Sequence, residues 1–290
     1  WLPARWSALH MPNPREIVEQ LSRLLPSGQV LSDASDLEHY GRDWTRQVPP
    51  APSAVVLPDT VAQVQALVAW ARATRVPLVP SGGRTGLSGG AVAAYGEVVV
   101  AMDRMNRVLG FDPADRRLRV QAGVVTEAVQ REAEARGLSY PVDFASRGSS
   151  QIGGNIATNA GGIKVLRHGL TRDWVAGLTV VTGTGERLEL NRGLVKNATG
   201  YDLRHLFIGS EGTLGIVVEA TIRLADAPAE QQVMVLAVPE MGALMEVFGL
   251  LRGRLRLSAF EFFTDLALRH VLARGAKPPF ESESPYYVLA

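Results

Sequence analysis

A glycine-rich loop, residues 81–90, is the first stretch of the sequence whose residue types suggest ligand chemistry. It reads Ser-Gly-Gly-Arg-Thr-Gly-Leu-Ser-Gly-Gly and follows an apolar run that ends at Pro80. Glycines adopt positive φ readily and let successive backbone N–H groups turn toward an anion. The loop is therefore typical of a phosphate site, and the competing interpretation is a flexible surface loop.

The sequence excludes the two commonest arrangements for binding phosphate. The Gly-x-x-x-x-Gly-Lys-Ser/Thr pattern is absent, which excludes a P-loop. A nicotinamide dinucleotide fingerprint opens a helix, whereas this loop leads into the apolar run 98–100, which is typical of a strand. We therefore expect the anion to be held by a nest of backbone N–H groups within the loop itself.

Two further stretches of small residues, 148–162 and 209–217, extend the pattern. The first mixes glycines with asparagines and a threonine, which would give a large flat ring a wall with hydrogen-bond donors. Its alternative is tight backbone packing in a core, and the alternative for the second stretch is a plain hairpin turn. Three such stretches in one region favour a single long ligand, and a dinucleotide is of the right size.

Candidate catalytic and metal-binding side chains are scarce. Cysteine is absent, and no two histidines have the spacing of metal ligands. The histidines are His10, His39, His168, His205 and His270. Only His168 follows a ligand-binding segment, and a packing or surface role is its competing interpretation. We therefore predict no metal site and assign no catalytic residue from the sequence.

The elements that must position these segments are helices and strands in alternation. Asn13 and Pro14 predict the start of a helix. Residues 53–57, a helix capped by Asp59 or Thr60, and residues 76–79 predict a βαβ unit. Further strands are predicted at 97–101, 117–121, 178–182, 188–190 and 214–224, with a helix over 125–135. The fold class is α+β.

A change of pattern near residue 228 predicts a domain boundary. We expect an N-terminal extension and helix over 1–48, a ligand-binding domain over 49–227, and the incomplete beginning of a second α+β domain over 228–290. The final strand, 286–289, is expected to lie at an edge without partners. Residues 1–10 are either a native start or an extension upstream of Met11.

Composition limits the classes of function. Hydrophobic residues make up 46% and charged residues 20%, and the formal net charge is +1. These values are ordinary for a soluble globular protein and do not favour a nucleic-acid partner. No apolar run approaches the roughly 18 residues that span a bilayer. The lack of cysteine suits a reducing compartment, so we expect a cytoplasmic location.

Together these segments resemble the PCMH-type FAD-binding domain of the vanillyl-alcohol oxidase superfamily. They are most similar to the D-2-hydroxyglutarate dehydrogenase, D-lactate dehydrogenase and glycolate oxidase large-subunit group. The residues that carry the likeness are 80–90, 148–162, 196–203 and 207–216, with further likeness at 258–262 and 284–287. It covers residues 50 to 290, and only the combination of motifs is specific.

The resemblance implies a two-subdomain FAD-binding domain, followed by the start of a substrate (cap) domain, and it implies residue roles. The positions implied to hold the pyrophosphate are Gly82, Gly83, Thr85, Gly86, Leu87 and Ser88, and Pro80, Ser81 and Arg84 are also expected to bind the cofactor. The stretch implied beside the flavin and its ribityl chain is residues 148–159, with Pro141 and Asp143. The positions named in it as cofactor-binding are Gly148, Ser149, Ile152, Gly153, Gly154, Asn155, Ala157, Thr158 and Asn159, and Gly161 is named as well. Those implied near the adenine are Glu211, Gly212, Gly215, Ile216 and Val217.

Position 84 differs from relatives that bind flavin covalently, because many of them carry a histidine in this loop. Arg84 stands there in this chain. We therefore expect FAD to be bound without a covalent link. The guanidinium either reaches a phosphate or points to solvent.

The reaction implied by the resemblance is hydride transfer from a D-2-hydroxy acid of the 2-hydroxyglutarate, lactate or glycolate class to the flavin. The family places its carboxylate-binding arginine, its metal site and its base in a C-terminal half. We therefore expect any divalent metal there, and poor turnover by residues 1–290 alone. An electron acceptor, such as a quinone or an electron-transfer protein, and a partner subunit are further expectations. Two alternatives stay open: a non-catalytic FAD-binding subunit of a multi-subunit oxidase, and a non-redox use as in alkylglycerone-phosphate synthesis.

Overall fold

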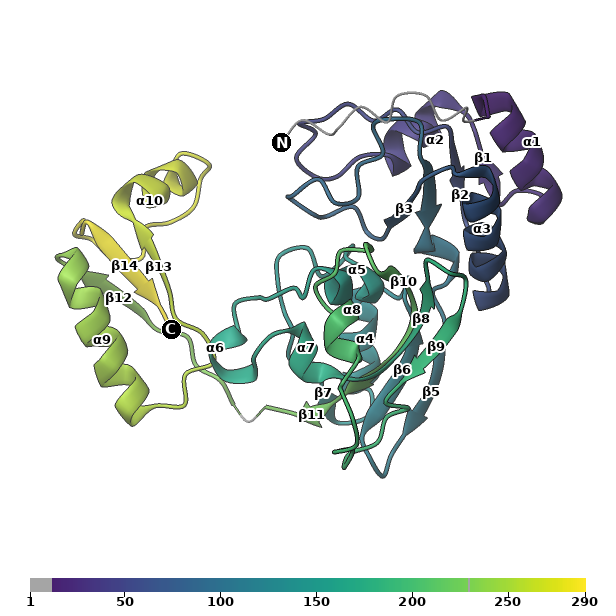
Figure 1. Cartoon of the computed structure of the whole chain (residues 1–290). Coiled ribbons are helices and arrows are strands. Elements are labelled where there is room, and N and C mark those ends of the chain that lie inside the picture. Colours follow the sequence, from purple (N-terminus) through teal and green to yellow (C-terminus); the bar gives the residue numbers. More distant parts are fainter. Residues whose placement is uncertain (1–11, 229) are drawn as a thin grey trace.

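The computed structural model describes residues 12–228 and 230–290. The prediction that residues 1–10 are either a native start or an extension upstream of Met11 concerns residues outside this described part. Three main sheets with their helices make up the described chain (Figure 1), which agrees with the α+β class expected from the sequence. No helix in this part of the chain is both long enough and apolar enough to cross a membrane.

The first sheet has the strand order β1-β2-β4-β3. Its strands are β1 (Val30–Leu31), β2 (Ala54–Val56), β3 (Leu78–Ser81) and β4 (Val98–Ala101). Both β2 and β3 run parallel to β4, which lies between them. The predicted βαβ unit is confirmed, although its two strands are separated by β4. Strand β4 is buried throughout, as expected for the centre of a parallel arrangement.

The helices of the first sheet begin where the sequence predicts. In α1 (Pro14–Leu24), the Asn13 side chain accepts from the Glu16 N–H, and the Glu16 carboxylate accepts from the Asn13 N–H. In α3 (Val61–Thr74), Thr60 caps the first turn. The two helices contact each other through Trp70, whose Nε1 donates to Gln20 Oε1 at 2.8 Å. Between them lies the short helix α2 (Ala34–Tyr40).

The second sheet is antiparallel, with the order β5-β6-β10-β8-β9. Its strands are β5 (Val108–Asp112), β6 (Arg117–Gln121), β8 (Val175–Thr182), β9 (Arg187–Leu190) and β10 (Gly215–Arg223). One hydrophobic core joins it to the first sheet, because the cluster extends from Leu21 in α1 through Val100 in β4 to Val218 in β10. The two sheets therefore form one body around a shared core.

Short helices lie beside the second sheet (Figure 1). They are α4 (Thr126–Glu134), α5 (Ile152–Ala157), α6 (Val165–His168), α7 (Thr171–Trp174) and α8 (Arg204–Phe207). Strands β7 (Leu138–Ser139) and β11 (Ala225–Asp226) pair with each other. Helix α4 was predicted, whereas α5 to α8 are too short for a periodic pattern to show them.

The C-terminal residues form a smaller sheet of order β12-β14-β13 with its own hydrophobic cluster. Its elements are β12 (Val235–Val238), α9 (Met241–Arg254), β13 (Glu261–Thr264), α10 (Asp265–Leu272) and β14 (Tyr286–Leu289). The prediction for residues 286–289 is wrong: β14 is the central strand and pairs with both neighbours. The error arose because strand order is set by tertiary packing, not by position in the sequence.

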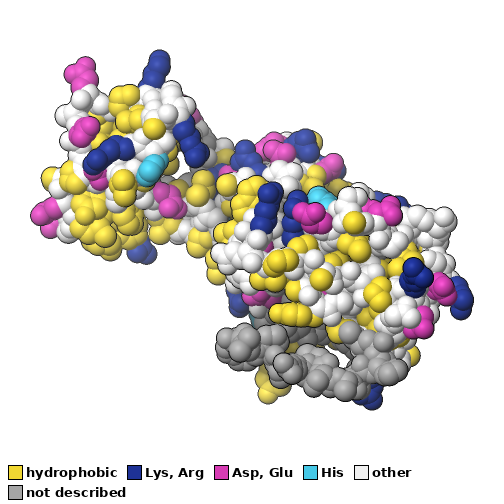
Figure 2. All heavy atoms as spheres, turned by 90° about the horizontal axis from the view of Figure 1, so that it is seen from above, with side chains coloured by type: hydrophobic (Ala, Val, Ile, Leu, Met, Phe, Trp, Pro, Cys, Tyr) yellow, Lys and Arg dark blue, Asp and Glu magenta, His cyan; other side chains and the backbone are white. Residues whose placement is uncertain are grey.

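The surface carries charges of both signs side by side, as the net charge of +1 suggests (Figure 2). Hydrophobic side chains gather on the C-terminal part in this view. Among the exposed hydrophobic residues of α9 are Met241, Met245 and Leu250, all more than half exposed.

Candidate functional site

A pocket of about 470 Å³ is lined by the loop after β3, by α5 and by the start of β10. All three small-residue segments line it, although they are far apart in the sequence. The predicted residues in its lining are Pro80, Ser81, Gly82, Gly83, Arg84, Thr85, Gly86, Leu87, Ser88, Gly153, Gly154, Asn155, Ala157, Thr158, Gly161, Glu211, Gly212, Gly215, Ile216 and Val217. This volume lies in the usual range for pockets that enclose small molecules and cofactors.

The first loop presents a row of unused backbone donors. Among the described residues, no acceptor receives the N–H group of any residue from 82 to 88, whereas the Gly89 N–H donates to Asp43. Residues 82–85 are half-buried, where N–H groups normally have partners, so this part of the row is suited to an anion. The binding of an anion by this loop stays a prediction.

Most glycines of this loop do not have the positive φ that the sequence suggests. Within residues 81–90 only Arg84 (φ 58°) and Gly89 (φ 81°) lie in the left-handed region. Gly83 is required by close packing instead: a Cβ there would lie 2.1 Å from the carbonyl oxygen of Ser149. The first loop thus rests directly on the second segment, and the expected role of positive φ at Gly83 is wrong.

Asp43 anchors the far end of the loop. Its Oδ2 accepts from the Gly89 N–H at 3.0 Å, and its Oδ1 accepts from the Thr45 N–H and hydroxyl. The side chain is 4% exposed and lines the pocket. Burial would raise the pKa of the Asp43 carboxyl, but the hydrogen bonds from Thr45 and Gly89 outweigh it, so the pKa lies below its ordinary value. The carboxylate form therefore holds the loop.

Arg84 neither points to solvent nor is free for a phosphate. Its guanidinium makes a paired contact with Asp103, at 3.0 and 3.2 Å, and donates to the Gly82 carbonyl at 2.8 Å. It also lies 4.7 Å from the centre of the Tyr40 ring. Both sequence-based alternatives for Arg84 therefore need correction, since the side chain braces the loop from within.

Part of the second segment forms α5, and it combines the tight packing that one interpretation expects with glycines that line the pocket. A Cβ at Gly153 would lie 2.7 Å from Ala122 Cβ, and one at Gly162 would lie 1.8 Å from the Asp143 carbonyl oxygen, so these glycines serve tight packing. Gly154 has open space beside it and lines the pocket. Asn155 Nδ2 donates to the buried Thr126 hydroxyl at 2.6 Å, which fixes this side chain in the wall.

Some predicted residues lie behind the pocket and do not line it. They are Pro141, Asp143, Gly148, Ser149, Ile152 and Asn159. Ile152 is fully buried in the core, and Ser149 supports Gly83. Asp143 binds Arg147 at 2.9 Å and Lys164 at 3.2 Å. Burial would raise its pKa, but these two cations hold it below its ordinary value. Of these six positions, Ser149 supports the first loop directly through its contact with Gly83.

The third segment closes the pocket at the start of β10. Gly212 has φ 79°, in the left-handed region that favours glycine, and a Cβ there would lie 3.1 Å from Pro80 Cγ. Glu211 also has positive φ, at 51°, and its carboxylate faces Gly90 across the opening. A non-glycine residue in this region is strained, which is common at functional sites.

Sequence reasoning missed several residues of the lining. They are Asp43, Gly90, Ala91, Met102, Phe144, Ser146, Ala160 and Ser210. Most of these are neighbours of predicted positions, so a wider window would have found them. Asp43 lies far away in the sequence and no local pattern indicates its contact with Gly89.

His168 does not line the pocket. Burial, together with Arg167 and Lys164, lowers the pKa of its imidazole. Its carbonyl accepts from Trp174 Nε1 at 2.7 Å, so the residue takes part in local packing. Within residues 12–228 and 230–290, no cluster of three or more His, Cys, Asp or Glu could hold a metal ion.

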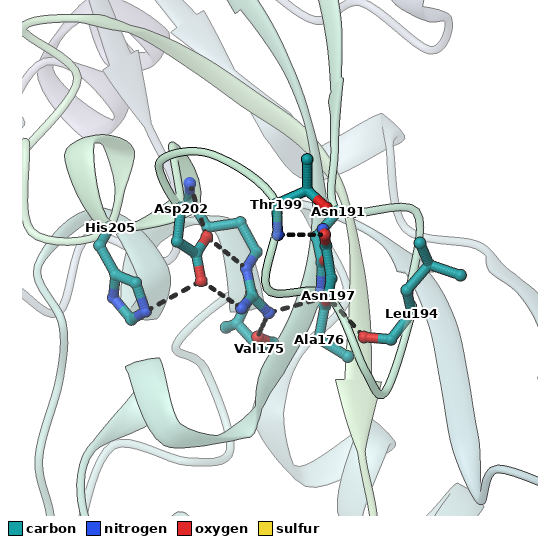
Figure 3. A network of polar contacts seen from close by, with 9 residues as sticks. Val175, Ala176, Asn191, Leu194, Asn197, Thr199, Asp202 and His205 are labelled. Atoms are coloured by element: carbon teal, nitrogen blue, oxygen red, sulfur yellow. Dashed lines mark hydrogen bonds and ion pairs between the residues drawn. The ribbon is translucent and has the colours of Figure 1, made fainter.

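The run 196–203 lies outside the pocket and is held by a polar network (Figure 3). The Arg204 guanidinium donates to Asp202 and to the carbonyls of Val175 and Ala176, at distances of 2.5 to 2.8 Å. This guanidinium holds the pKa of the Asp202 carboxyl below its usual value. His205 lies 3.5 Å from the same carboxylate. The network fastens the end of the run to β8.

The lining fits a cofactor with an anionic middle through the first loop and the wall beside it. The N–H groups of residues 82–88 have no partner among the described residues, and these residues line the pocket. Gly154 has open space beside it, which leaves room for a flat ring. Within residues 12–228 and 230–290, Ser81 Oγ and Gln151 Oε1 also lack a hydrogen-bond partner, but both atoms are covered by protein and present no surface to a ligand.

The same segments are recognised by comparison with known proteins. Residues 52–191 match the model of a family described as an FAD-binding domain. The chain carries an FAD-binding domain of this family. FAD is therefore its cofactor, and the pocket that the three segments enclose is the candidate site for it.

Several known proteins are similar in sequence to most of this chain. A D-2-hydroxyglutarate dehydrogenase from Xanthomonas citri pv. viticola is 61% identical over 279 residues, which are 96% of this chain and 59% of that protein. The mitochondrial D-2-hydroxyglutarate dehydrogenase of Bos taurus is 39% identical, over 93% of this chain and 50% of its own length. A D-lactate dehydrogenase from Anaerostipes hadrus is 36% identical, over 77% of this chain and 46% of its own. The chain thus spans less than two thirds of the length of these relatives.

A solved structure has the same fold. An alkyldihydroxyacetonephosphate synthase superposes with a TM-score of 0.79, over 97% of this chain and 56% of that chain. Only 23% of the aligned residues are identical. The likeness confirms the architecture expected of a PCMH-type FAD-binding domain.

Proposed function

We propose that this chain binds FAD in the pocket between the three small-residue segments, and that the flavin accepts a hydride from a D-2-hydroxy acid. The observation that carries the proposal is the row of N–H groups from residue 82 to residue 88, which have no partner among the described residues and belong to a loop that lines the pocket. The substrate class rests on the names of the relatives, of which the first two are D-2-hydroxyglutarate dehydrogenases.

Each part of the pocket has a separate task in this proposal. The N–H groups of the first loop bind the pyrophosphate, and Asp43 and Arg84 hold that loop in place. Helix α5 with its small residues provides a flat wall for the flavin and shields it from water. The turn at Glu211 and Gly212 borders the adenine end. When bound, FAD supplies the acceptor for the hydride that leaves the hydroxyl-bearing carbon.

The remaining features of the whole protein are also proposals. An electron acceptor, either a quinone or an electron-transfer protein, must reoxidise the flavin after each turnover. We place the end of the FAD-binding domain near residue 227, where β11 gives way to the separate C-terminal sheet. The cytoplasmic location and the partner subunit stay predictions.

The test is anaerobic mixing of the FAD-loaded protein, expressed from its complete gene, with D-2-hydroxyglutarate. We expect the visible absorption of the flavin to bleach with saturable kinetics. The same measurement with D-lactate and glycolate ranks these acids against D-2-hydroxyglutarate as substrates. L-2-Hydroxyglutarate is the matched control, because it has the same charge and size but presents its hydrogen to the opposite side.

Bleaching by neither enantiomer, with FAD bound at full occupancy, would contradict the proposed reaction. That result would favour the non-redox alternative or a non-catalytic subunit. Equal bleaching by both enantiomers would contradict the stereochemical part of the proposal.

A further inference from the structure

The joint between the FAD-binding body (residues 12–228) and the C-terminal unit (residues 230–290) contains a pocket of about 270 Å³. Figure 1 shows the segment that follows α9 passing beside α6. The body and the C-terminal unit both contribute to the lining, which consists of Leu166, Arg167, Arg252, Leu255, Arg256 and Leu257. None of these residues lines the cofactor pocket. This joint pocket is therefore a separate site.

Few interactions hold the body and the C-terminal unit together. Among the described residues, one hydrogen bond crosses between them: Arg167 Nη1 donates to the Arg256 carbonyl at 3.2 Å. Each hydrophobic cluster of the described chain lies within the body or within the C-terminal unit. Units joined by so small an interface are expected to move relative to each other. A ligand in the joint pocket would therefore add substantially to the contact.

Three guanidinium groups line the joint pocket without a carboxylate beside them. Within the described part of the chain, no ion pair includes Arg167, Arg252 or Arg256. Arg256 lies beyond the last turn of α9, so stabilisation of the helix end does not explain it. Like charges around one pocket repel each other, and an anion between them removes this repulsion.

The apolar part of the lining selects among anions. A guanidinium group binds a carboxylate or a phosphate through paired hydrogen bonds. The side chains of Leu166, Leu255 and Leu257 add apolar surface, which favours a ligand that also contains aliphatic carbon. An aliphatic chain with a carboxylate at each end meets both conditions. Its two charges can be bound from α6 and from the C-terminal unit at once.

We propose that the joint pocket binds an aliphatic dicarboxylate, and that the bound dicarboxylate fastens the C-terminal unit to α6. Helix α6 is packed against the wall of the cofactor pocket: a Cβ at Gly161, which lines that pocket, would lie 3.1 Å from Val165 Cγ2 at the start of α6. The bound dicarboxylate thereby fixes the C-terminal unit beside this wall. The inference requires neither bound FAD nor the proposed reaction.

The experiment measures glutarate binding by calorimetry to the purified protein, expressed from its complete gene and supplied with FAD, and to Arg252→Gln and Arg256→Gln. Glutarate is the probe because it has no hydroxyl group to oxidise. We expect each variant to bind glutarate about 2- to 5-fold more weakly, the value of one solvent-exposed ion pair.

Arg254→Gln is the matched control for the loss of one positive charge at this end of α9. Arg254 also lies in the last turn of the helix and belongs to no ion pair among the described residues, but it does not line the joint pocket. The glutarate affinity of this variant should equal that of the unaltered protein.

Amide hydrogen exchange tests whether the ligand fastens the two units. With glutarate bound, exchange should slow on both sides of the joint, in α6 and in residues 255–257. Arg167→Gln should lose much of this protection on both sides, because it removes a guanidinium of α6 together with the hydrogen bond to the Arg256 carbonyl.

A ligand series keeps the test valid if an arginine variant fails to fold. In the unaltered protein, glutarate should protect residues 255–257 at lower concentration than butyrate, which has one carboxylate. It should also act at lower concentration than inorganic phosphate, which has no aliphatic chain.

Unchanged glutarate affinity in both Arg252→Gln and Arg256→Gln, an equal loss in Arg254→Gln, or protection by phosphate equal to that by glutarate would each overturn the inference. Protection on one side of the joint alone would overturn the fastening of the two units. A failure of the proposed function has a different result, namely no bleaching of the flavin while glutarate still protects the joint.

Discussion

The contact between Gly83 and Ser149 allows the sharpest test of how the cofactor loop is held. Replacement of Gly83 by alanine would bring a Cβ to 2.1 Å from the Ser149 carbonyl oxygen and 2.8 Å from Ser150 Cα, whereas ordinary contacts begin near 3.4 Å. The second segment cannot easily retreat, since the Ser149 and Ser150 N–H groups both donate to Ser146 and the Ser150 carbonyl accepts from Thr126. The first loop must therefore move by more than an ångström.

The expected loss of FAD affinity in Gly83→Ala follows from the free-energy cost of overpacking. Extra atoms in a packed region cost about 1–3 kcal/mol. If the loop returns to its position only when FAD binds, FAD affinity falls by roughly 5- to 150-fold. Gly86→Ala is the matched control, because Gly86 lies in the same loop with a negative φ and nothing within 4 Å of its Cβ position. That variant should keep its affinity within about twofold.

Flavin fluorescence measures the affinities, and circular dichroism checks that both variants are folded. Full FAD affinity in Gly83→Ala would refute the packing argument. An equal loss in Gly86→Ala would mean that any side chain in the loop disturbs binding, whatever it contacts.

Three further predictions concern the loop and the cofactor. Arg84→Lys and Asp103→Asn should each weaken FAD binding, and the double variant should be no weaker than the worse single one, because both break the same paired contact; additive losses would show independent roles. The pKa of Asp43 is depressed in the folded protein, so its carboxylate stabilises the loop above the unfolded value and loses this effect as pH falls below about 4. The affinity advantage of the unaltered protein over Asp43→Asn should therefore be constant near neutral pH and shrink in acid; a constant ratio throughout would contradict it. Acid precipitation should release all FAD into the supernatant, and yellow colour left in the pellet would show a covalent link instead.

Local patterns in the sequence predicted the parts of the site that depend on backbone chemistry. The glycines of residues 81–90 predicted a nest, and the turn at Gly212 has the positive φ that its residue type suggests. The caps at Asn13 and Thr60 likewise predicted where α1 and α3 begin. Such features depend on a few neighbouring residues, so they can be predicted without knowledge of the fold.

Features that depend on long-range packing could not be predicted. Asp43 reaches Gly89 across the fold, and Arg84 finds Asp103 beyond β4. Glycine is required at position 83 by the close approach to Ser149, whereas the sequence suggested a positive φ as the reason. Strand β14 gained two partners because the chain returns to place it between β12 and β13.

Titration of the purified apoprotein with FAD tests the central claim most directly. The claim is that the three segments form one FAD site, so calorimetry should give one FAD per chain. ADP, which shares the pyrophosphate, should compete for the same site. Binding of FAD that ADP does not displace, or that persists unchanged in the Gly83→Ala and Asp43→Asn variants, would contradict the account.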